Sequence, residues 1–269
     1  GLGSPVLLYL ASAGIGCIGI IDDDVVDISN LQRQIIHSSI SIGDSKVDSA
    51  SNRLKELNPE NIIETYDYRL NVDNALEIIS KFDLVVDGTD NFETRYIIND
   101  ACEILNKTWV FGSIHRFDGQ VSVFNHRGGP NYRDLFPQAP PPELAPNCAE
   151  AGVLGVLPGL VGSIQANEAL KIILDIGEPL SGKLLTIDAL SMQIRSLSFI
   201  KDPKRQKITE LSEEAISCAV TGNQNGEGSA NFEFRYEDIL PTEFKARTSA
   251  GWKPFFLDVR TEIEERIVS

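Results

Sequence analysis

The chain has 269 residues, 42% of them hydrophobic, and its 24 basic and 39 acidic residues give a net charge of −15. A chain this acidic is repelled by phosphate backbones, which argues against nucleic-acid binding. No apolar run reaches the ~20 residues that a bilayer span needs, and no signal-peptide pattern is present. We therefore expect a cytoplasmic protein with no membrane segment.

Helix-like and strand-like patterns alternate along the first 200 residues. Near-continuous apolar strands between amphipathic helices predict the α/β class, with a doubly wound, mostly parallel, Rossmann-like sheet. In chain order the expected elements are helix 4–15, strand 17–22, helix 45–59, strand 61–70, helix 74–82, strand 83–87, helix 93–108, strands 109–114 and 119–125, helix 156–176 and strands 183–189 and 192–200.

Two segments interrupt this alternation. Residues 126–152 are rich in Pro and turn residues and too long for an ordinary connection, so they form either a functional crossing loop or a disordered segment. Residues 201–229 lose periodicity and end in Gly, Asn and Ser, which is typical of a linker. An α/β pattern then restarts. We predict a domain over 1–200, a linker over 201–229 and an incomplete domain over 230–269.

A glycine turn opens the chain directly before the first helix. The exposed N–H groups of a helix N-terminus suit a phosphate, although a turn that only glycine can make explains Gly1 and Gly3 equally well. Asp22 follows about twenty residues later, at the end of the next strand, where it can accept a hydrogen bond from a ribose hydroxyl. Asp23 and Asp24 are expected to be solvated turn residues.

Two cations follow this aspartate run. Arg33 and Lys46 as isolated residues would be surface charges, but near a nucleotide they would stabilise the charge that spreads over oxygens during phosphoryl or nucleotidyl transfer. A second pair of carboxylates, Asp87 and Asp90, lies where a buried strand ends. Such a carboxylate can hold Mg²⁺, or Asp90 can cap the helix that starts near Phe92.

Cys148 is the one thiol in a functional setting. It lies in the long loop just ahead of a helix, and a helix N-terminus lowers the pKa of a thiol and makes it more nucleophilic. An unreactive loop cysteine remains the alternative. The three histidines lack metal-ligand spacing and are interpreted as structural or surface residues.

Long stretches of the chain resemble a known family. The segments "GLGSP", "IIDDDVVDISNLQRQIIH", "VVDGTDNFETR" and "NCAEAGVLGVLPGLVGSIQANEALKIIL" resemble the MoeB/ThiF adenylating enzymes, relatives of the ubiquitin-activating enzymes. The resemblance runs from residue 1 to about 199. The later segment "KPFFLDVRTEIEE" resembles the start of a rhodanese domain, a sulfurtransferase fold that is also found fused to such enzymes.

The resemblance implies a reaction. With ATP and Mg²⁺, the C-terminal Gly-Gly carboxylate of a small ubiquitin-like sulfur carrier (MoaD/ThiS-like) is adenylated and pyrophosphate is released. A sulfur donor such as a cysteine desulfurase then supports thiocarboxylate formation for molybdopterin or thiamin synthesis, or for tRNA thiolation. The family also implies a homodimer.

The resemblance assigns roles to individual residues. Cys148 matches a crossover-loop cysteine that in some relatives forms a covalent link to the carrier or the sulfur. The residues assigned to ATP are Gly1 in the phosphate loop, Asp22 at the ribose, Asn30, Arg33 and Lys46 at the phosphates, and Asp90 with Asn91 at the metal and phosphate end, where Asp90 would hold the metal.

The chain departs from the family in three places. Many relatives hold zinc with two CxxC pairs, but the corresponding stretches "NYRDLF" and "KDPKRQKITEL" have no cysteine, so we expect no zinc. The first strand of the sheet and the segment before it are missing, and the rhodanese-like part stops before its catalytic cysteine. We therefore expect a fragment truncated at both ends.

Two other functions remain open from the residues. A glycine turn followed by Asp22 would also serve an NAD-dependent Rossmann oxidoreductase, although hydride transfer needs neither Arg33 nor Lys46. A non-catalytic carrier-binding subunit is the second alternative, although such a subunit would be expected to lose the ATP-binding residues first.

Overall fold

The structure, a computed structural model, describes residues 1–137 and 152–211. The chain divides into two units, 1–223 and 224–269, and the described residues all belong to the first. The predicted boundaries at 200 and 229 remain predictions. The rhodanese-like segment and Cys148 lie outside the described residues.

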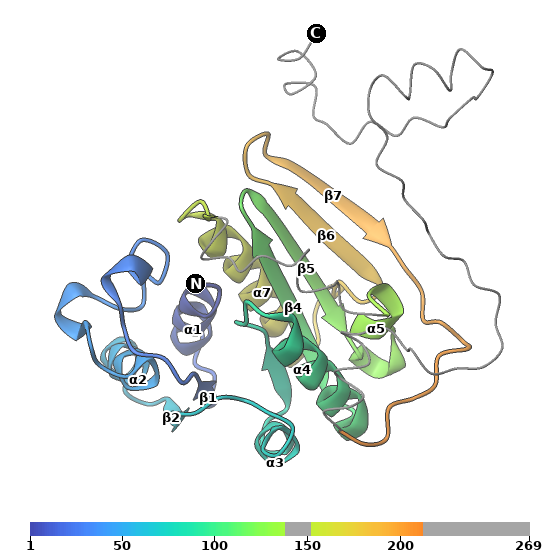
Figure 1. Cartoon of the computed structure of the whole chain (residues 1–269), viewed down its shortest axis with the longest axis horizontal. Helices are drawn as coiled ribbons and strands as arrows, with labels where there is room; N and C mark the ends of the chain where they lie inside the picture. The colour runs from blue at the N-terminus through green and yellow to red at the C-terminus, as the bar shows by residue number, and fades with distance from the viewer. Residues whose placement is uncertain (138–151, 212–269) are drawn as a thin grey trace, which may run out of the picture. The chain divides into compact units, whose positions relative to one another are not determined.

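The first part of the chain forms two helices and a pair of parallel strands (Figure 1). β1 and β2 pair in parallel, with Ile18 opposite Ile63, because α2 returns the chain to the same end of the pair. Two short 3₁₀ turns, Ile28–Asn30 and Ser39–Ser41, lie between β1 and α2. The bounds are α1 Gly3–Ser12, β1 Cys17–Ile21, α2 Lys46–Leu57 and β2 Ile62–Tyr66.

The rest of the described chain builds a five-stranded sheet in the order β3-β4-β5-β6-β7. The short helix α5 lies in the segment for which the sequence predicted no regular structure. The bounds are α3 Ala75–Ser80, β3 Leu84–Val86, α4 Phe92–Leu105, β4 Thr108–His115, β5 Asp118–Phe124, a 3₁₀ turn His126–Gly128, α5 Tyr132–Leu135, α7 Leu157–Leu174, β6 Lys183–Asp188 and β7 Gln193–Ser198.

Strand direction changes within this sheet. β3 and β4 are parallel, whereas β4, β5, β6 and β7 are successively antiparallel. Only Arg116 and Phe117 separate β4 from β5, and so short a connection makes a hairpin, since a parallel crossover needs a dozen or more residues. The predicted α/β class is confirmed, and the antiparallel region is larger than the sequence indicated.

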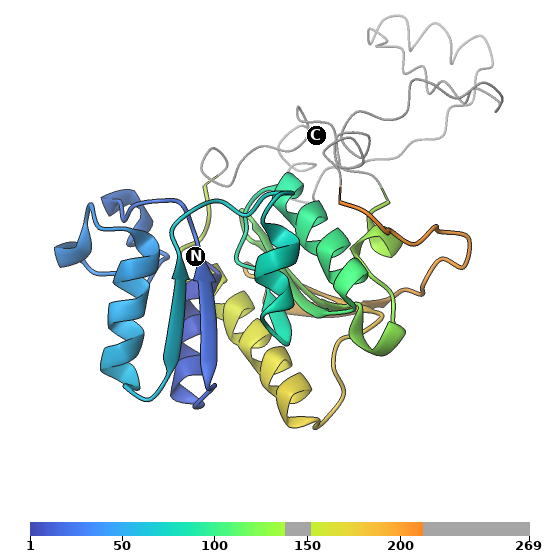
Figure 2. The ribbon, with the colours of Figure 1, turned by 90° about the horizontal axis from the view of Figure 1, so that it is seen from below.

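Helices cover both faces of the sheet (Figure 2). Successive residues of β4 alternate between the two faces. Trp109 and Phe111 pack with α4 in one buried cluster, and Val110 belongs to a second cluster that includes Ala169 of α7. The ring centroids of Trp109 and Phe111 lie 5.6 Å apart in an edge-on arrangement, and such aromatic pairs add roughly 0.5–1.5 kcal/mol beyond their burial.

α1 packs against α7, and the contact is close because Gly162 of α7 has no side chain. A Cβ at this position would lie 2.6 Å from the carbonyl oxygen of Leu2 and 2.5 Å from Pro5. This packing fixes the N-terminus of α1 beside the end of β3.

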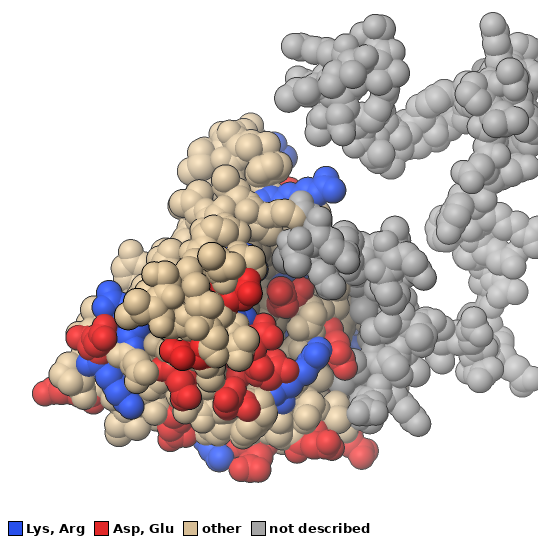
Figure 3. All heavy atoms as spheres, turned by 60° about the vertical axis from the view of Figure 1, so that its left-hand side comes forward, with Lys and Arg blue, Asp and Glu red and all other residues tan. Residues whose placement is uncertain are grey.

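The surface agrees with the acidic composition. The side shown in Figure 3 carries more Asp and Glu than Lys and Arg over its lower part, and its upper part is mostly uncharged, with Lys and Arg side chains along its right edge. No helix in the described ranges is long and apolar enough to cross a membrane.

Candidate active site

The glycine turn lies against the turn that follows β3. A Cβ on Gly88 would lie 3.7 Å from the backbone nitrogen of Gly3, and a Cβ on Gly1 would lie 3.8 Å from Cδ of Arg33. Two segments that the sequence singled out separately, residues 1–3 and 87–91, therefore meet at the N-terminus of α1. The backbone N–H groups there suit an anion.

The charged residues assigned to the nucleotide surround Gly1. Arg33 and Lys46 lie near enough to Gly1 for their positive charges to act on a group there. Asp22 and Asp90 act in the opposite direction. All four side chains are thus close enough to Gly1 to influence the charge of a group there.

Lys46 is buried rather than at the surface. It is the first residue of α2, 8% exposed, and its Nζ donates to Asp24 Oδ2 at 2.7 Å. Asp24 is exposed, as expected, but it is an ion-pair partner and not simply solvated. Burying an ammonium is costly unless it is paired, so this position indicates a role for the charge.

Asp22 follows β1 and is half-buried. Its Oδ1 accepts a hydrogen bond from the Asp24 backbone nitrogen at 3.0 Å. Burial raises the pKa of Asp22, while Lys46 and the Asp24 N–H lower it. The carboxylate therefore lies at the strand end, where open α/β sheets bind ligands.

Asn30 ends the 3₁₀ turn Ile28–Asn30, whose N-cap Asp27 accepts a hydrogen bond from the Ser29 backbone nitrogen, and Arg33 lies three residues further on. Arg33 Nη1 donates to the Ser29 carbonyl at 3.2 Å, and Asn30 Nδ2 donates to Ser29 Oγ at 3.4 Å. Within the described ranges Arg33 forms no ion pair. Its charge is thus available to an anionic ligand.

Asn91, not Asp90, caps α4. The Asn91 side chain accepts from the Thr94 backbone nitrogen at 2.9 Å, so the alternative that Asp90 is the cap is wrong. Asp90 is exposed and its carboxylate has no hydrogen-bond partner in the part of the chain that the structure describes. A free carboxylate beside a phosphate site fits Mg²⁺, which takes one or two protein carboxylates plus phosphate oxygens.

The sequence assigned no functional role to two further residues, Arg95 and His37, although His37 was interpreted with the other histidines as structural or surface. Arg95, 5% exposed, donates from Nη2 to the Thr89 carbonyl at 3.0 Å. His37 is half-buried, with its Nδ1 2.9 Å from Ser49 Oγ. Burial, followed by the charge of Lys46, lowers the pKa of His37 to about 4. Arg95 ends the segment "VVDGTDNFETR" but was given no role there, and His37 has no motif spacing, so the contacts of both residues are revealed by the fold.

His37 predicts a pH dependence of stability. Its folded pKa of about 4 lies below the ordinary value of 6.5, so the unfolded chain binds an extra proton between these pH values. Stability should be fully present above about pH 6.5 and fall as the pH drops toward 4. Urea unfolding at pH 7.5, 6.0 and 5.0 should show a weaker decline in His37→Gln than in the wild type. Equal declines in the wild type and the variant would rule out His37 as the cause. The pKa of His126 is also lowered, but His126 is present in both proteins and cannot produce a difference between them.

The comparison with known proteins identifies the family. Residues 1–209 match the ThiF family. This chain belongs to the ThiF family. The resemblance read from the sequence is thereby confirmed.

Several curated relatives cover most of this ThiF-family chain. It is 45% identical over 272 residues to a probable adenylyltransferase/sulfurtransferase MoeZ of Mycobacterium tuberculosis, which covers 100% of this chain and 68% of that protein. It is 51% identical over 209 residues to a sulfur carrier protein adenylyltransferase of Thermus thermophilus, and this alignment covers 76% of this chain and 77% of that protein. An adenylyltransferase and sulfurtransferase MOCS3 of Arabidopsis thaliana is 40% identical, in an alignment that covers 100% of this chain and 60% of that protein.

Solved structures support the fold. The E. coli MccB crystal structure superimposes with a TM-score of 0.68 at 20% identity, over 78% of this chain and 62% of that one.

At the C-terminal end, the alignments with MoeZ and the Arabidopsis protein cover the whole chain. Both relatives are named as sulfurtransferases as well as adenylyltransferases, in agreement with the predicted rhodanese-like segment.

Proposed function

We propose that this chain uses ATP to adenylate the C-terminal Gly-Gly carboxylate of a small ubiquitin-like sulfur carrier. The names of its relatives support the reaction, above all the sulfur carrier protein adenylyltransferase at 51% identity. The observation that carries the proposal in this chain is that the glycine turn lies against the turn after β3 and beside Arg33, with Lys46, Asp22 and Asp90 near enough for their charges to act on Gly1. A hydride-transfer site has no need of these cations, so the relatives and the site together favour adenylation over an NAD-dependent oxidoreductase.

Each residue has a task in this reaction. The α1 N-terminus binds phosphate oxygens, Asp22 accepts from a ribose hydroxyl, and Asn30 donates to a phosphate. As the carrier carboxylate forms a bond to the α-phosphorus and the bond to pyrophosphate breaks, Arg33 and Lys46 stabilise the charge on the phosphoryl oxygens.

Asp90 would hold Mg²⁺, with Asn91 beside it at the phosphate end. The ion, when bound, neutralises charge on the phosphates. The expectation that no zinc is bound stays a prediction.

Further steps and partners belong to the same proposal. A sulfur donor such as a cysteine desulfurase would supply the sulfur, and Cys148 would form the covalent link; the pathway would lie in the cytoplasm. A homodimer is supported by a groove of about 530 Å³ with a mostly apolar lining, because contiguous apolar surface marks protein interfaces. Its exposed side chains include Tyr9, Val156, Met192 and Ile194.

ATP–pyrophosphate exchange tests the proposed reaction. The full natural protein should exchange label from pyrophosphate into ATP in the presence of a carrier that ends in Gly-Gly. The matched control is the same carrier without its last two residues, which should support no exchange because no carboxylate reaches the α-phosphate. Exchange that is equal with both carriers, or NAD binding in place of ATP binding, would contradict the proposal.

The same assay separates the non-catalytic alternative. A carrier-binding subunit would bind the carrier, and could bind ATP, without any exchange. A folded protein that binds both but exchanges nothing with any Gly-Gly carrier would favour that alternative.

A further inference from the structure

We propose that Arg95 is a positioning residue that holds the turn after β3 in the one conformation that presents Asp90 to its ligand. This inference rests on the proposed function, because Asp90 matters only if the site binds a nucleotide with its metal.

The turn between β3 and α4 is fixed from within by Asp87. Its Oδ1 accepts from the backbone nitrogen of Thr89 at 2.8 Å and from the Thr89 hydroxyl at 2.7 Å. The Asp87 side chain is fully buried, and Gln165 Nε2 donates to its carbonyl at 2.8 Å. The start of the turn is therefore anchored to the core.

Arg95 holds the other end of the turn. From the first turns of α4 its Nη2 reaches back to the Thr89 carbonyl at 3.0 Å, which is the peptide group that leads into Asp90. One residue later Asn91 is fixed by its cap hydrogen bond to Thr94. Asp90 thus lies between two anchored positions, while its own carboxylate is exposed and has no hydrogen-bond partner among residues 1–137 and 152–211.

The ion pair of Arg95 with Asp87 is too long for a hydrogen bond. Arg95 Nε and Asp87 Oδ2 are 3.7 Å apart, and both atoms are buried without a hydrogen-bond partner within the ranges described. The buried pair between Arg133 and Asp100 makes two hydrogen bonds of 2.7 Å. Buried polar groups are normally satisfied, and the Arg95 guanidinium also faces the Tyr132 hydroxyl, so it is placed for the Thr89 carbonyl and this hydroxyl rather than for a close pair with Asp87.

Two aromatic rings lie close to the guanidinium. Its central carbon lies 5.6 Å from the centroid of Phe92 and 5.5 Å from that of Phe111. A planar guanidinium can stack on rings and donate in a fixed direction at the same time, and an ammonium cannot do both. The arrangement predicts that Lys at position 95 keeps the charge but loses the hold on the turn.

The test compares Arg95→Lys with Arg133→Lys in pyrophosphate exchange over a Mg²⁺ titration. Both variants replace a buried, ion-paired arginine that lies over an aromatic ring, so their stability losses should be similar, which thermal melting checks. Arg95→Lys should raise the Mg²⁺ concentration for half-maximal exchange by about tenfold, and Arg133→Lys by less than about twofold.

A double-mutant cycle separates positioning from general damage. If Arg95 acts through Asp90, Arg95→Lys should change exchange by less than about twofold once Asp90→Asn is present. The same loss in both backgrounds, or a Mg²⁺ shift shared by Arg133→Lys, would overturn the inference. A wild type without any exchange would instead contradict the proposed function.

A second variant is needed if the melting temperature of Arg95→Lys is well below that of Arg133→Lys. Phe92→Leu loosens one side of the guanidinium without removing it. It should shift the Mg²⁺ requirement in the same direction by about threefold, and no shift at an unchanged melting temperature would likewise overturn the inference.

Discussion

Replacing Lys46 by Met should lower carrier-dependent pyrophosphate exchange by roughly 10²- to 10³-fold, the loss typical of removing one preorganised group that stabilises charge in a transition state. The ammonium lies near Gly1 and Asp22, and it is 8% exposed. Because little water reaches this position, the attraction of the ammonium for phosphate oxygens is screened far less than at the surface. Met keeps an unbranched apolar side chain of similar length at this first position of α2.

The same change should cost little stability. The ion-pair partner, Asp24, has a side chain that is 70% exposed, so water takes over its solvation when the ammonium is gone. Exposed carboxylates of this kind gain at most about 1 kcal/mol from such a pair. Activity and stability should therefore separate clearly in this variant.

Lys55→Met is the matched control for Lys46→Met. Lys55 lies on the same helix and is exposed, so its loss should leave exchange within about twofold of the wild type. Exchange and melting temperature are measured for both variants. Equal exchange rates in the two variants would contradict a role for Lys46 in the reaction. So would a melting temperature of Lys46→Met low enough to explain its lost activity by unfolding.

Much of the fold could be predicted from the sequence, because each helix and strand is encoded locally. The helix over 4–15 and the strand over 17–22 correspond to α1 and β1. The direction of the later strands was harder to predict, since an apolar run such as 109–114 fits a parallel and an antiparallel neighbour equally well. The two-residue connection at 116–117 was the available signal.

The candidate site could be predicted only in part. Asp22 and Asp90 follow strands, and the carboxyl ends of strands gather at one edge of a sheet. The burial of Lys46 and the hydrogen bond from Arg95 to Thr89 depend on how helices pack, which no local pattern encodes. Arg95 occupies a position in α4 that charged residues commonly fill at a surface, so only the fold shows that it is buried.

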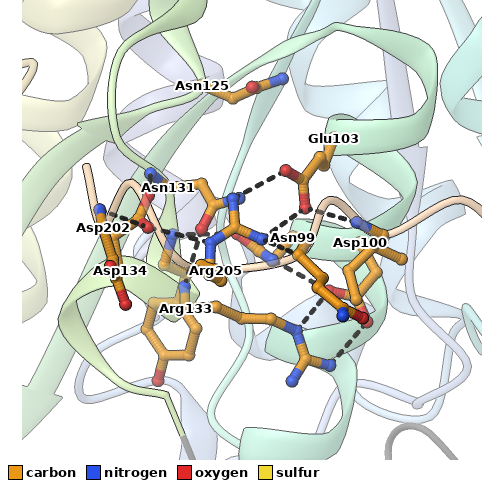
Figure 4. A network of polar contacts seen from close by, with 12 residues as sticks. Asn99, Asp100, Glu103, Asn125, Asn131, Arg133, Asp134, Asp202 and Arg205 are labelled. Atoms are coloured by element: carbon orange, nitrogen blue, oxygen red, sulfur yellow. Dashed lines mark hydrogen bonds and ion pairs between the residues drawn. The ribbon is translucent and has the colours of Figure 1, made fainter.

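Arg205→Ala should destabilise the folded domain by about 3 kcal/mol, because it leaves two buried carboxylates without their cation. Arg205 donates two hydrogen bonds to Glu103 of α4, at 2.7 and 2.9 Å, and a third to Asp134 of α5 at 2.9 Å (Figure 4). The Glu103 and Asp134 side chains are 4% and 0% exposed. The hydrogen bonds to Glu103 raise the pKa of Arg205 above its ordinary value, against the effect of burial.

This cluster also bears on the metal expectation. It joins "NYRDLF" to "KDPKRQKITEL", the two stretches at which relatives with CxxC pairs would hold zinc. A guanidinium offers donors and no lone pair to a metal, so Arg205 does not fit a zinc site. The segment from Asp202 to Ile208, within the predicted linker, is tied to α4 and α5 by these contacts.

Thermal melting and urea unfolding measure the effect of Arg205→Ala. A loss of about 3 kcal/mol corresponds to a melting temperature lower by roughly 6–12 °C for a domain of this size, and EDTA should leave the melting of the wild type unchanged. Arg53→Ala is the control, because Arg53 and Glu56 form an exposed pair that should contribute less than about 1 kcal/mol.

Removing the charges on both sides separates pairing from packing. Arg205→Met combined with Glu103→Gln and Asp134→Asn leaves no uncompensated charge, and neutral replacements of buried ion pairs are often tolerated. The triple variant should therefore be more stable than Arg205→Ala, although it carries more substitutions. If it is less stable, the cluster acts through shape and hydrogen bonding more than through charge, and α5 would be held to α4 by packing around Tyr96 and Tyr132.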